Sequence, residues 1–323
     1  MVDYCTAALE MCAILLNIKS KDEVIMPSYT FVSTANAFVL RGAKPVYVDI
    51  DPKTMNIDTN KIEALITNKT KAIIIVHYAG VSCDMEKIAN LTRKYRIPLI
   101  EDAAQAILAK YKNKSLGSFG DLSALSFHES KNIHCGHGGA LLINNKKFIN
   151  RSEIIRDKGT NRKNFLNNLV NKYTWVDIGS SYGLDEINAA FLFGQLKQSK
   201  KIINGRMKIW KYYHNKLKKL ELQKKIQRPE IPKFSKHNAH IYYIHILSKK
   251  RDQLIKYLKN KKICATFHYI PLHDSPYGIK ISNKKTYLEN TSKKSNTILR
   301  LPLYLSLKQS EIDYIIKTLK KIL

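Results

Sequence analysis

The sequence predicts an α/β protein with a mostly parallel central sheet. Short apolar runs alternate with helical segments throughout the first half of the 323 residues. The run 72–76, Ala-Ile-Ile-Ile-Val, is apolar at every position, which is typical of a strand covered by helices on both faces. Because 44% of the residues are hydrophobic, there is ample material for a buried core. We therefore expect a layered architecture with ligands at the carboxyl ends of the strands.

The predicted elements follow in a regular order. Strands are expected at residues 23–26, 45–50, 72–77, 97–101, 122–127 and 140–144, and helices at 31–40, 61–66 and 85–95. Residues 184–220 form a long helical stretch, and Pro229 and Pro232 then begin a different segment. Single cores stop growing at about 250 to 300 residues. We therefore expect a large domain over 1–205 and a smaller C-terminal α+β domain over 206–323.

The charge is strongly basic and unevenly spread. The 55 Lys and Arg against 26 Asp and Glu give a net charge of +29, of which residues 1–200 carry +7 and residues 201–323 carry +22. Such a surplus attracts nucleic acid or phosphorylated ligands. The basic third, however, holds no homeodomain, zinc-finger or RNA-recognition signature, and its lysines lie among Asn and Ile. We interpret the surplus as compositional and expect no nucleic-acid partner.

The cysteines and the hydropathy of the chain indicate its cellular compartment. Five cysteines at irregular spacing do not form the even framework of a secreted scaffold, so we expect reduced thiols. The apolar stretch 11–18 is too short to span a bilayer and has no basic leader. These features favour a cytoplasmic protein that is not bound to a membrane.

A cluster of metal-ligand residue types lies within ten positions: His128, His134, Cys135 and His137. Their spacing matches no zinc motif, and no second Cys/His pair accompanies them. We therefore expect no metal site. The neighbouring glycines at 136, 138 and 139 form no phosphate-binding fingerprint, and we interpret them as turn residues with positive φ.

Two residues at strand ends indicate the chemistry. Asp102 ends the predicted strand 97–101, where a carboxylate can hold a cationic ring nitrogen. Lys131 follows the predicted strand 122–127 and is a candidate for a Schiff base. A lysine in a dry pocket has a lowered pKa, and only the neutral amine attacks an aldehyde. The pair predicts pyridoxal phosphate (PLP), which needs a lysine and an acidic partner for its ring nitrogen.

A phosphate anchor is expected where Thr6 opens the apolar helical run 8–16. Free amides and a hydroxyl at a helix N-terminus bind anions. An ordinary N-cap explains the same threonine, and the two interpretations are compatible.

Longer stretches carry a family resemblance. They are residues 22–50, 77–80 (His-Tyr-Ala-Gly), 101–105 (Glu-Asp-Ala-Ala-Gln), 126–132 (Ser-Phe-His-Glu-Ser-Lys-Asn), 158–162, 172–182 and 267–273. From Tyr4 to the C-terminus the chain resembles the sugar aminotransferases of the DegT/DnrJ/EryC1/StrS group, which have fold type I of the PLP enzymes.

The resemblance implies roles for individual residues. Lys131 matches the Schiff-base lysine, Asp102 the partner of the pyridinium nitrogen and Gln105 a neighbour of the ring hydroxyl. The remaining implied cofactor contacts are Phe31 over the ring, Thr6, Ala7 and Ser126 at the phosphate, and Ser181 at the phosphate of a neighbouring subunit. The last of these implies a homodimer with shared active sites. The implied substrate-side residues are Tyr182, His268, Tyr269 and His273.

The implied activity is transfer of an amino group from glutamate to a nucleotide-linked 4-keto-6-deoxy sugar during synthesis of cell-surface polysaccharide. The expected conversion is of dTDP-4-dehydro-6-deoxyglucose to dTDP-4-amino-4,6-dideoxygalactose. The gluco epimer, another nucleotide sugar, an inactive truncated enzyme and a non-enzymatic basic binding protein are the alternatives. Because Lys131 is present, a sugar dehydratase of this fold is disfavoured.

Three features depart from the family pattern. We expect the family's segment before Cys5 to be missing. Tyr4 stands where a small residue is usual, and His137 replaces an acidic residue before Gly138.

Overall fold

The central sheet is mixed and mostly parallel, as the sequence predicts. The computed structural model describes residues 1–248, 251–282 and 286–323. The strands have the spatial order β2-β1-β3-β4-β7-β8, and only β8 runs antiparallel to its neighbour. Their bounds are Glu23–Pro27 (β1), Lys44–Val48 (β2), Thr70–Val76 (β3), Leu99–Asp102 (β4), Leu122–Ser126 (β7) and Gly139–Ile143 (β8).

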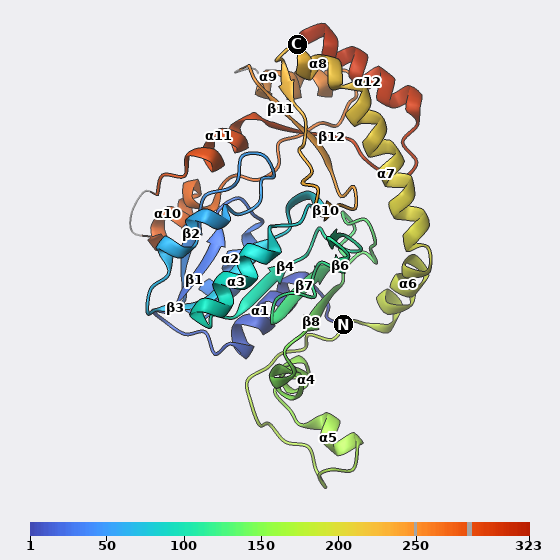
Figure 1. Cartoon of the computed structure of the whole chain (residues 1–323). Coiled ribbons are helices and arrows are strands. Elements are labelled where there is room, and N and C mark those ends of the chain that lie inside the picture. The colour runs from blue at the N-terminus through green and yellow to red at the C-terminus, as the bar shows by residue number, and fades with distance from the viewer. Residues whose placement is uncertain (249–250, 283–285) are drawn as a thin grey trace.

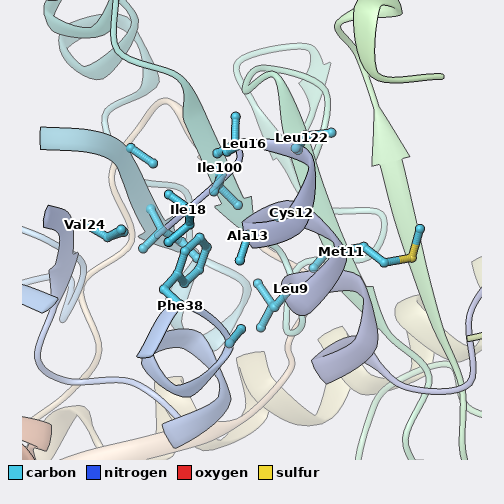
Figure 2. Close-up of a cluster of buried hydrophobic side chains, with 14 of the residues drawn as sticks. Leu9, Met11, Cys12, Ala13, Leu16, Ile18, Val24, Phe38, Ile100 and Leu122 are labelled. Atoms are coloured by element: carbon cyan, nitrogen blue, oxygen red, sulfur yellow. The ribbon is translucent and has the colours of Figure 1, made fainter. Parts of the chain in front are cut away.

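Helices cover both faces of this sheet. One face packs against α1 (Cys5–Leu15) and α2 (Val32–Val39), and Figure 2 shows Leu9 and Ala13 of α1 beside Phe38 of α2 and Ile100 of β4. The other face packs against α3 (Met85–Tyr95). Within β3, Ile74 belongs to the first core, whereas Ile73 and Ile75 belong to the second. The continuous apolar run is therefore explained by burial on both faces.

The register of the strands places Asp102 at the carboxyl edge of the sheet. Val76 of β3 is paired with Asp102 of β4, and Asp102 is paired with Ala124 of β7. Since these strands are parallel, their carboxyl ends meet at one edge, and the loops that leave them share that edge.

The prediction of a helix over residues 61–66 is wrong. Two short 3-10 turns, Thr59–Lys61 (η1) and Glu63–Leu65 (η2), occupy this stretch. The Asp58 side chain accepts a hydrogen bond from the Asn60 amide at the start of the first turn, and Ile62 is fully buried. A stretch this short has too few apolar side chains to stabilise a packed helix.

The C-terminal part has its own sheet and core (Figure 1). Its sheet has the order β12-β11-β9 and is antiparallel. The strands are Ile226–Gln227 (β9), Tyr242–Ile246 (β11) and Ile298–Leu301 (β12). The helices are Ser199–Lys216 (α7), Lys218–Leu222 (α8), Arg251–Asn260 (α9), Pro276–Ser282 (α10), Glu289–Thr297 (α11) and Gln309–Ile322 (α12). Position 205 lies within α7, and the domain division expected there stays a prediction.

A three-stranded sheet joins distant parts of the chain. The hairpin of β5 (Lys110–Tyr111) and β6 (Lys114–Ser115) pairs with β10 (Ser235–Lys236). Sequence patterns did not predict these strands, because each has only two residues.

An arm containing α5 (Arg162–Leu166) extends away from the sheet beyond α4 (Ile149–Arg156), as Figure 1 shows. Further along the chain, α6 (Glu186–Lys197) leads into α7. Large apolar side chains on these segments are exposed, including Trp175 at 80% and Ile187 at 84%. Among the described residues, no helix is long and apolar enough to cross a membrane.

Candidate active site

A cavity of about 570 Å³ lies at the carboxyl edge of the central sheet. It is lined by residues from α1, the start of α2, the ends of β4 and β7, and the C-terminal part. The predicted site residues on its wall are Thr6, Phe31, Asp102, Gln105, Ser126, Lys131, His268 and Tyr269. The structure therefore brings eight of the predicted positions together from segments that lie far apart in the sequence.

Asp102 is the buried carboxylate of this cavity. Its Oδ2 accepts a hydrogen bond of 2.7 Å from the Thr34 hydroxyl, and its Oδ1 accepts one of 3.1 Å from the Ala104 amide. Burial raises the pKa of Asp102, while these hydrogen bonds and the charge of Lys131 act in the opposite direction. A cation placed against a buried carboxylate stabilises the ionised form of that carboxylate.

Lys131 lies on the loop after β7. The loop turns tightly, since the Lys131 amide donates to the His128 carbonyl at 2.9 Å and the Glu129 amide donates to the Gly136 carbonyl at 2.9 Å. Burial lowers the pKa of the Lys131 amine, and the negative charge of Asp102 partly offsets that effect. A lowered pKa makes the neutral, nucleophilic amine more available.

The N-terminus of α1 opens onto the same cavity. The first amides of a helix have no partner within it, so they can bind an anion. The hydroxyl of Thr6 lies 2.8 Å from that of Ser33, and both residues line the cavity together with Ser126. Ala7 is buried in the core beneath this turn and does not line the cavity.

Close packing of β8 against α1 shapes this cradle. A Cβ added to Gly139 would lie 2.5 Å from the Cys5 nitrogen and 2.5 Å from the Tyr4 carbonyl carbon. Tyr4, not Thr6, is the N-cap residue, so the N-cap interpretation of Thr6 is wrong. Only Gly136 of the three glycines has a positive φ, at 82°, so Gly138 and Gly139 serve close approach rather than a left-handed turn.

Gln105 and the aromatic residues form another part of the wall. The Gln105 Oε1 accepts from the Ala79 amide at 2.7 Å, and its Nε2 donates to the Tyr269 hydroxyl at 2.9 Å. The ring of Tyr269 lies 6.3 Å from that of Phe31, which is 56% exposed at the cavity. These contacts hold Tyr269 on the wall and leave the Phe31 ring accessible.

His268 is fixed by a buried tyrosine. The Tyr78 hydroxyl lies 2.6 Å from His268 Nδ1. Burial raises the pKa of Tyr78 far above its usual value and lowers that of His268 far below its usual value. A protonated Tyr78 hydroxyl and a neutral His268 imidazole therefore share this hydrogen bond.

Besides Ala7, three further predicted residues lie outside the cavity. Ser181 is exposed at the base of the arm, where it pairs with Asp157. The Tyr182 hydroxyl donates to Glu10 at 3.1 Å. His273 is buried, with its Nδ1 2.6 Å from the Ser28 hydroxyl.

Several residues on or beneath the wall were missed by sequence reasoning. Thr34 and Ser33 lie in α2, and His240 and Arg300 come from the C-terminal part. His240 Nδ1 lies 3.1 Å from the Asn132 Oδ1. No local pattern marks these positions, because tertiary packing alone brings them to the cavity.

The cluster of His128, His134, Cys135 and His137 does not converge. Across the described ranges there is no group of three or more His, Cys, Asp or Glu side chains that could hold a metal ion. His137 instead packs its ring 5.0 Å from that of Tyr4 and 5.9 Å from that of His128. The two residues expected to depart from the family pattern, Tyr4 and His137, therefore contact each other.

A model of the DegT/DnrJ/EryC1/StrS aminotransferase family matches residues 1–320. The chain belongs to this family. GDP-perosamine synthase of Caulobacter vibrioides is 32% identical over 98% of this chain and 84% of its own length. The spore coat polysaccharide biosynthesis protein SpsC of Bacillus subtilis is 31% identical over 99% of this chain and 84% of its own length.

A solved structure agrees in fold with this chain. NtdA from Bacillus subtilis, with bound cofactor PMP, matches 99% of this chain and 72% of its own length, with a TM-score of 0.89 and 29% identity. The expected family and fold are thereby confirmed, and the chain is a PLP-dependent aminotransferase.

The residues present fit this cofactor. Asp102 could supply a buried carboxylate for a ring cation, Lys131 an amine for an aldehyde, and the start of α1 amides for a phosphate. When bound, PLP acts as an electron sink that makes the proton on the amine-bearing carbon of a substrate acidic. The contribution of the protein is to hold the ring, place the amine and limit access of water.

Proposed function

We propose that this protein transfers the amino group of glutamate to C4 of dTDP-4-dehydro-6-deoxyglucose, giving dTDP-4-amino-4,6-dideoxygalactose for cell-surface polysaccharide. The observation that carries the proposal is the presence of Lys131 and Asp102 on one cavity wall in a member of a sugar aminotransferase family. The name of SpsC, which includes polysaccharide biosynthesis, agrees with this role.

In the proposed reaction Lys131 moves protons. Its amine, whose pKa is lowered by burial, would take a proton from the carbon that carries the donor nitrogen and would deliver one to the carbon on the other side of that nitrogen. Asp102 stays ionised against the ring nitrogen and keeps that nitrogen protonated. Phe31 covers one face of the ring, and Thr6 and Ser126 hold the phosphate. Gln105, whose Nε2 donates a hydrogen bond to the Tyr269 hydroxyl, would contact the ring hydroxyl.

A homodimer with shared active sites is part of the proposal. Ser181 does not reach the cavity of its own chain, and its exposure leaves it available to a second copy. Exposed apolar side chains in the segments on either side of it in the sequence include Trp175, Ile187 and Phe193, at 80%, 84% and 61% exposure. Exposed apolar surface of this kind is typical of a protein interface. In the dimer we expect Ser181 to contact the partner's cofactor phosphate.

The remaining substrate-side assignments are specific to this proposal. His268 and Tyr269 line the cavity, and we assign to them contacts with the sugar. Tyr182 and His273 lie outside it, so we assign them to the rim and to support of the substrate loop. The five free cysteines fit a reducing compartment, and we propose that the enzyme acts in the cytoplasm.

A second candidate substrate is a GDP-linked 4-keto sugar. It is favoured by the 32% identity to GDP-perosamine synthase over nearly the whole chain. The gluco epimer of the dTDP product has the opposite configuration at C4. It forms when the keto sugar presents its other face to the cofactor, so both products are compared in the same assay.

The test combines reduction and product analysis. Borohydride treatment of the PLP-loaded protein, followed by peptide mass analysis, should place a pyridoxyl group on Lys131. Incubation with glutamate and dTDP-4-dehydro-6-deoxyglucose should give an axial C4 amine by NMR. An amine only on the GDP-linked substrate would support the second candidate. Absence of label on Lys131 and of any amino sugar would refute both.

A further inference from the structure

His240 joins the C-terminal part to the loop that carries Lys131. Its Nδ1 lies 3.1 Å from Oδ1 of Asn132, the residue directly after Lys131. Its backbone is held by the buried Arg206, whose guanidinium donates hydrogen bonds to the carbonyls of Ala239 and His240 at 3.1 and 2.7 Å. His240 is itself buried and, like Lys131, lines both the main cavity and a second cavity of about 430 Å³. The two side chains therefore lie together where these cavities adjoin.

Asn132 fixes which nitrogen of the His240 ring is protonated. The Asn132 Nδ2 donates a hydrogen bond of 2.8 Å to the carbonyl of Asn238. A carbonyl oxygen only accepts hydrogen bonds, so the amide oxygen of Asn132 must be the atom that faces His240. His240 Nδ1 is then the donor to that oxygen and carries a proton. Asn238 is held in turn, because its own Nδ2 donates to the carbonyls of Gln105 and Ile107 at 2.9 Å.

The other ring nitrogen of His240 is left as a free acceptor. Burial lowers the pKa of His240 well below its usual value, and nearby basic groups act in the same direction: Lys131, Arg206, Arg300 and His268. The ring is therefore neutral at pH 7, and with the proton on Nδ1 its Nε2 has a lone pair. Across the described ranges this Nε2 has no hydrogen-bond partner, and it is not sealed from solvent.

The amine of Lys131 has the complementary need. It has hydrogens to donate, yet within the described part of the chain it has no hydrogen-bond or ion-pair partner. Asp102 acts on its charge but is required by the ring nitrogen of the cofactor, and burial raises the pKa of the Cys5 thiol, which therefore stays protonated. A carboxylate acceptor would hold the amine as an ammonium, which cannot take a proton. A neutral imidazole stabilises the charged form less.

These observations give His240 a role in the reaction. Resting on the proton transfer proposed for Lys131, we infer that His240 is a positioning residue, whose Nε2 accepts a hydrogen bond from the Lys131 amine and orients that amine toward the reacting carbon. With one N–H held, the amine has fewer orientations, so its lone pair is presented to the substrate more often. Asn132 acts through His240, since it sets which ring nitrogen is protonated.

The test measures the pKa of the Lys131 amine in the cofactor-free protein, where neither donor nor sugar is needed. Wild type and variants are labelled with a trace of acetic anhydride at a series of pH values, and peptide mass analysis gives the extent of labelling at Lys131. His240→Leu should lower the pKa of Lys131 by about one unit, because a hydrogen bond that stabilises the charged amine is lost. His240→Gln places an amide oxygen near the position of Nε2 and should restore that pKa to within about 0.3 of wild type.

His245→Leu is the matched control. His245 is another buried histidine, lies in β11 and has its Nδ1 3.0 Å from the Thr297 hydroxyl, but it lines neither cavity. Its substitution should lower the melting temperature without changing the pKa of Lys131. If His240→Leu does not fold, as judged by its melting curve, His240→Asn decides. Its shorter amide reaches the position of Nδ1 but not that of Nε2, so it should lower the pKa of Lys131 as well.

A second measurement follows proton transfer in the PLP-loaded protein. Exchange of the glutamate α-hydrogen for deuterium, monitored by NMR, needs no sugar. His240→Leu should slow this exchange at least about 10-fold and leave the KM for glutamate within about twofold of wild type, because the amine is misplaced while the binding site is kept.

Four results would overturn the inference: an unchanged pKa of Lys131 in His240→Leu, an equal fall in His240→Leu and His240→Gln, an equal fall in His245→Leu, and a normal rate of exchange in His240→Leu. The second and third would show that His240 only supports packing. The proposed function is tested separately by amino transfer in the wild type. If the pKa of Lys131 and the exchange depend on His240 but no amino sugar is formed, the proposed function fails while the inference stands.

Discussion

The hydroxyl of Thr34 donates a 2.7 Å hydrogen bond to Oδ2 of Asp102, and both side chains are buried. Thr34 lies in the first turn of α2, three residues after Phe31, the N-cap residue of that helix. One helix start therefore carries both the exposed ring at the cavity and the hydroxyl that orients the carboxylate beneath it. The Thr30 hydroxyl, 2.7 Å from that of Thr34, extends this network.

Thr34→Val should impair the enzyme through Asp102. The substitution removes a donor that lowers the pKa of Asp102, so that pKa rises further above its usual value. Asp102 must be ionised to pair with the ring cation, so loss of activity at low pH should begin at a higher pH than in wild type. We expect about a 10-fold lower rate and weaker cofactor binding at neutral pH. The pH–rate profile and cofactor titration measure both effects.

Thr318→Val is the matched control for this change. Thr318 lies in α12 and does not line the cavity. Its hydroxyl donates a hydrogen bond to the Tyr314 carbonyl at 2.8 Å. The Thr318→Val variant loses a comparable hydrogen bond, so its melting temperature should fall, but its pH–rate profile should not shift. An unchanged acid limb in Thr34→Val would show that this hydroxyl does not tune Asp102.

Much of this site could be predicted because parallel strands bring their carboxyl ends together. Asp102 ends β4 and Lys131 follows β7, and these neighbouring strands place both residues at one edge. Thr34 and Arg300 gave no such signal. The position of Arg300 depends on pairing with Thr266 and on the contact between two parts of the chain, neither of which leaves a periodic pattern. The antiparallel direction of β8 was likewise not predicted, since an apolar run has no direction.

Glu101 should be essential for stability rather than for chemistry. It is fully buried and accepts hydrogen bonds from the amides of Gly117, Phe119 and Gly120 at 2.7 to 2.8 Å, and lies 2.9 Å from His77 Nε2. Burial raises its pKa, but the hydrogen bonds outweigh burial and leave the pKa below its usual value. We expect Glu101→Gln to lower the free energy of unfolding by about 3 to 5 kcal/mol at pH 7, because it breaks a buried charged network.

The pH dependence of this effect has a definite sign. Because the folded pKa of Glu101 is lowered, its contribution is present above its unfolded pKa of about 4.3 and is lost as the pH falls through the folded value. The gap between wild type and Glu101→Gln in urea unfolding should therefore shrink at low pH. Glu63→Gln is the control, since this exposed side chain should change stability little. A gap that does not depend on pH would contradict this account.

Lys131→Ala should abolish amino transfer while leaving sugar binding intact. The loss of the proton-transferring amine is expected to lower the rate by at least about 10³-fold. The affinity for dTDP, measured by calorimetry, should stay close to that of wild type. Lys293→Ala, which alters an exposed lysine away from the cavity, should keep full activity. Equal loss of activity and of nucleotide affinity would instead indicate that Lys131 supports the cavity structurally.

Gly139→Ala should displace the N-terminus of α1 and weaken cofactor binding. The added Cβ would lie 2.5 Å from the Cys5 nitrogen and from the Tyr4 carbonyl carbon, and neither backbone atom can move without shifting the helix start. Overpacking of this kind costs about 1 to 3 kcal/mol, so we expect the cofactor to dissociate about 10-fold more readily. Gly183→Ala, where no atom lies within 4 Å of the added Cβ, is the control and should bind cofactor normally. If both variants retain wild-type cofactor affinity, the close approach of β8 does not shape the phosphate cradle.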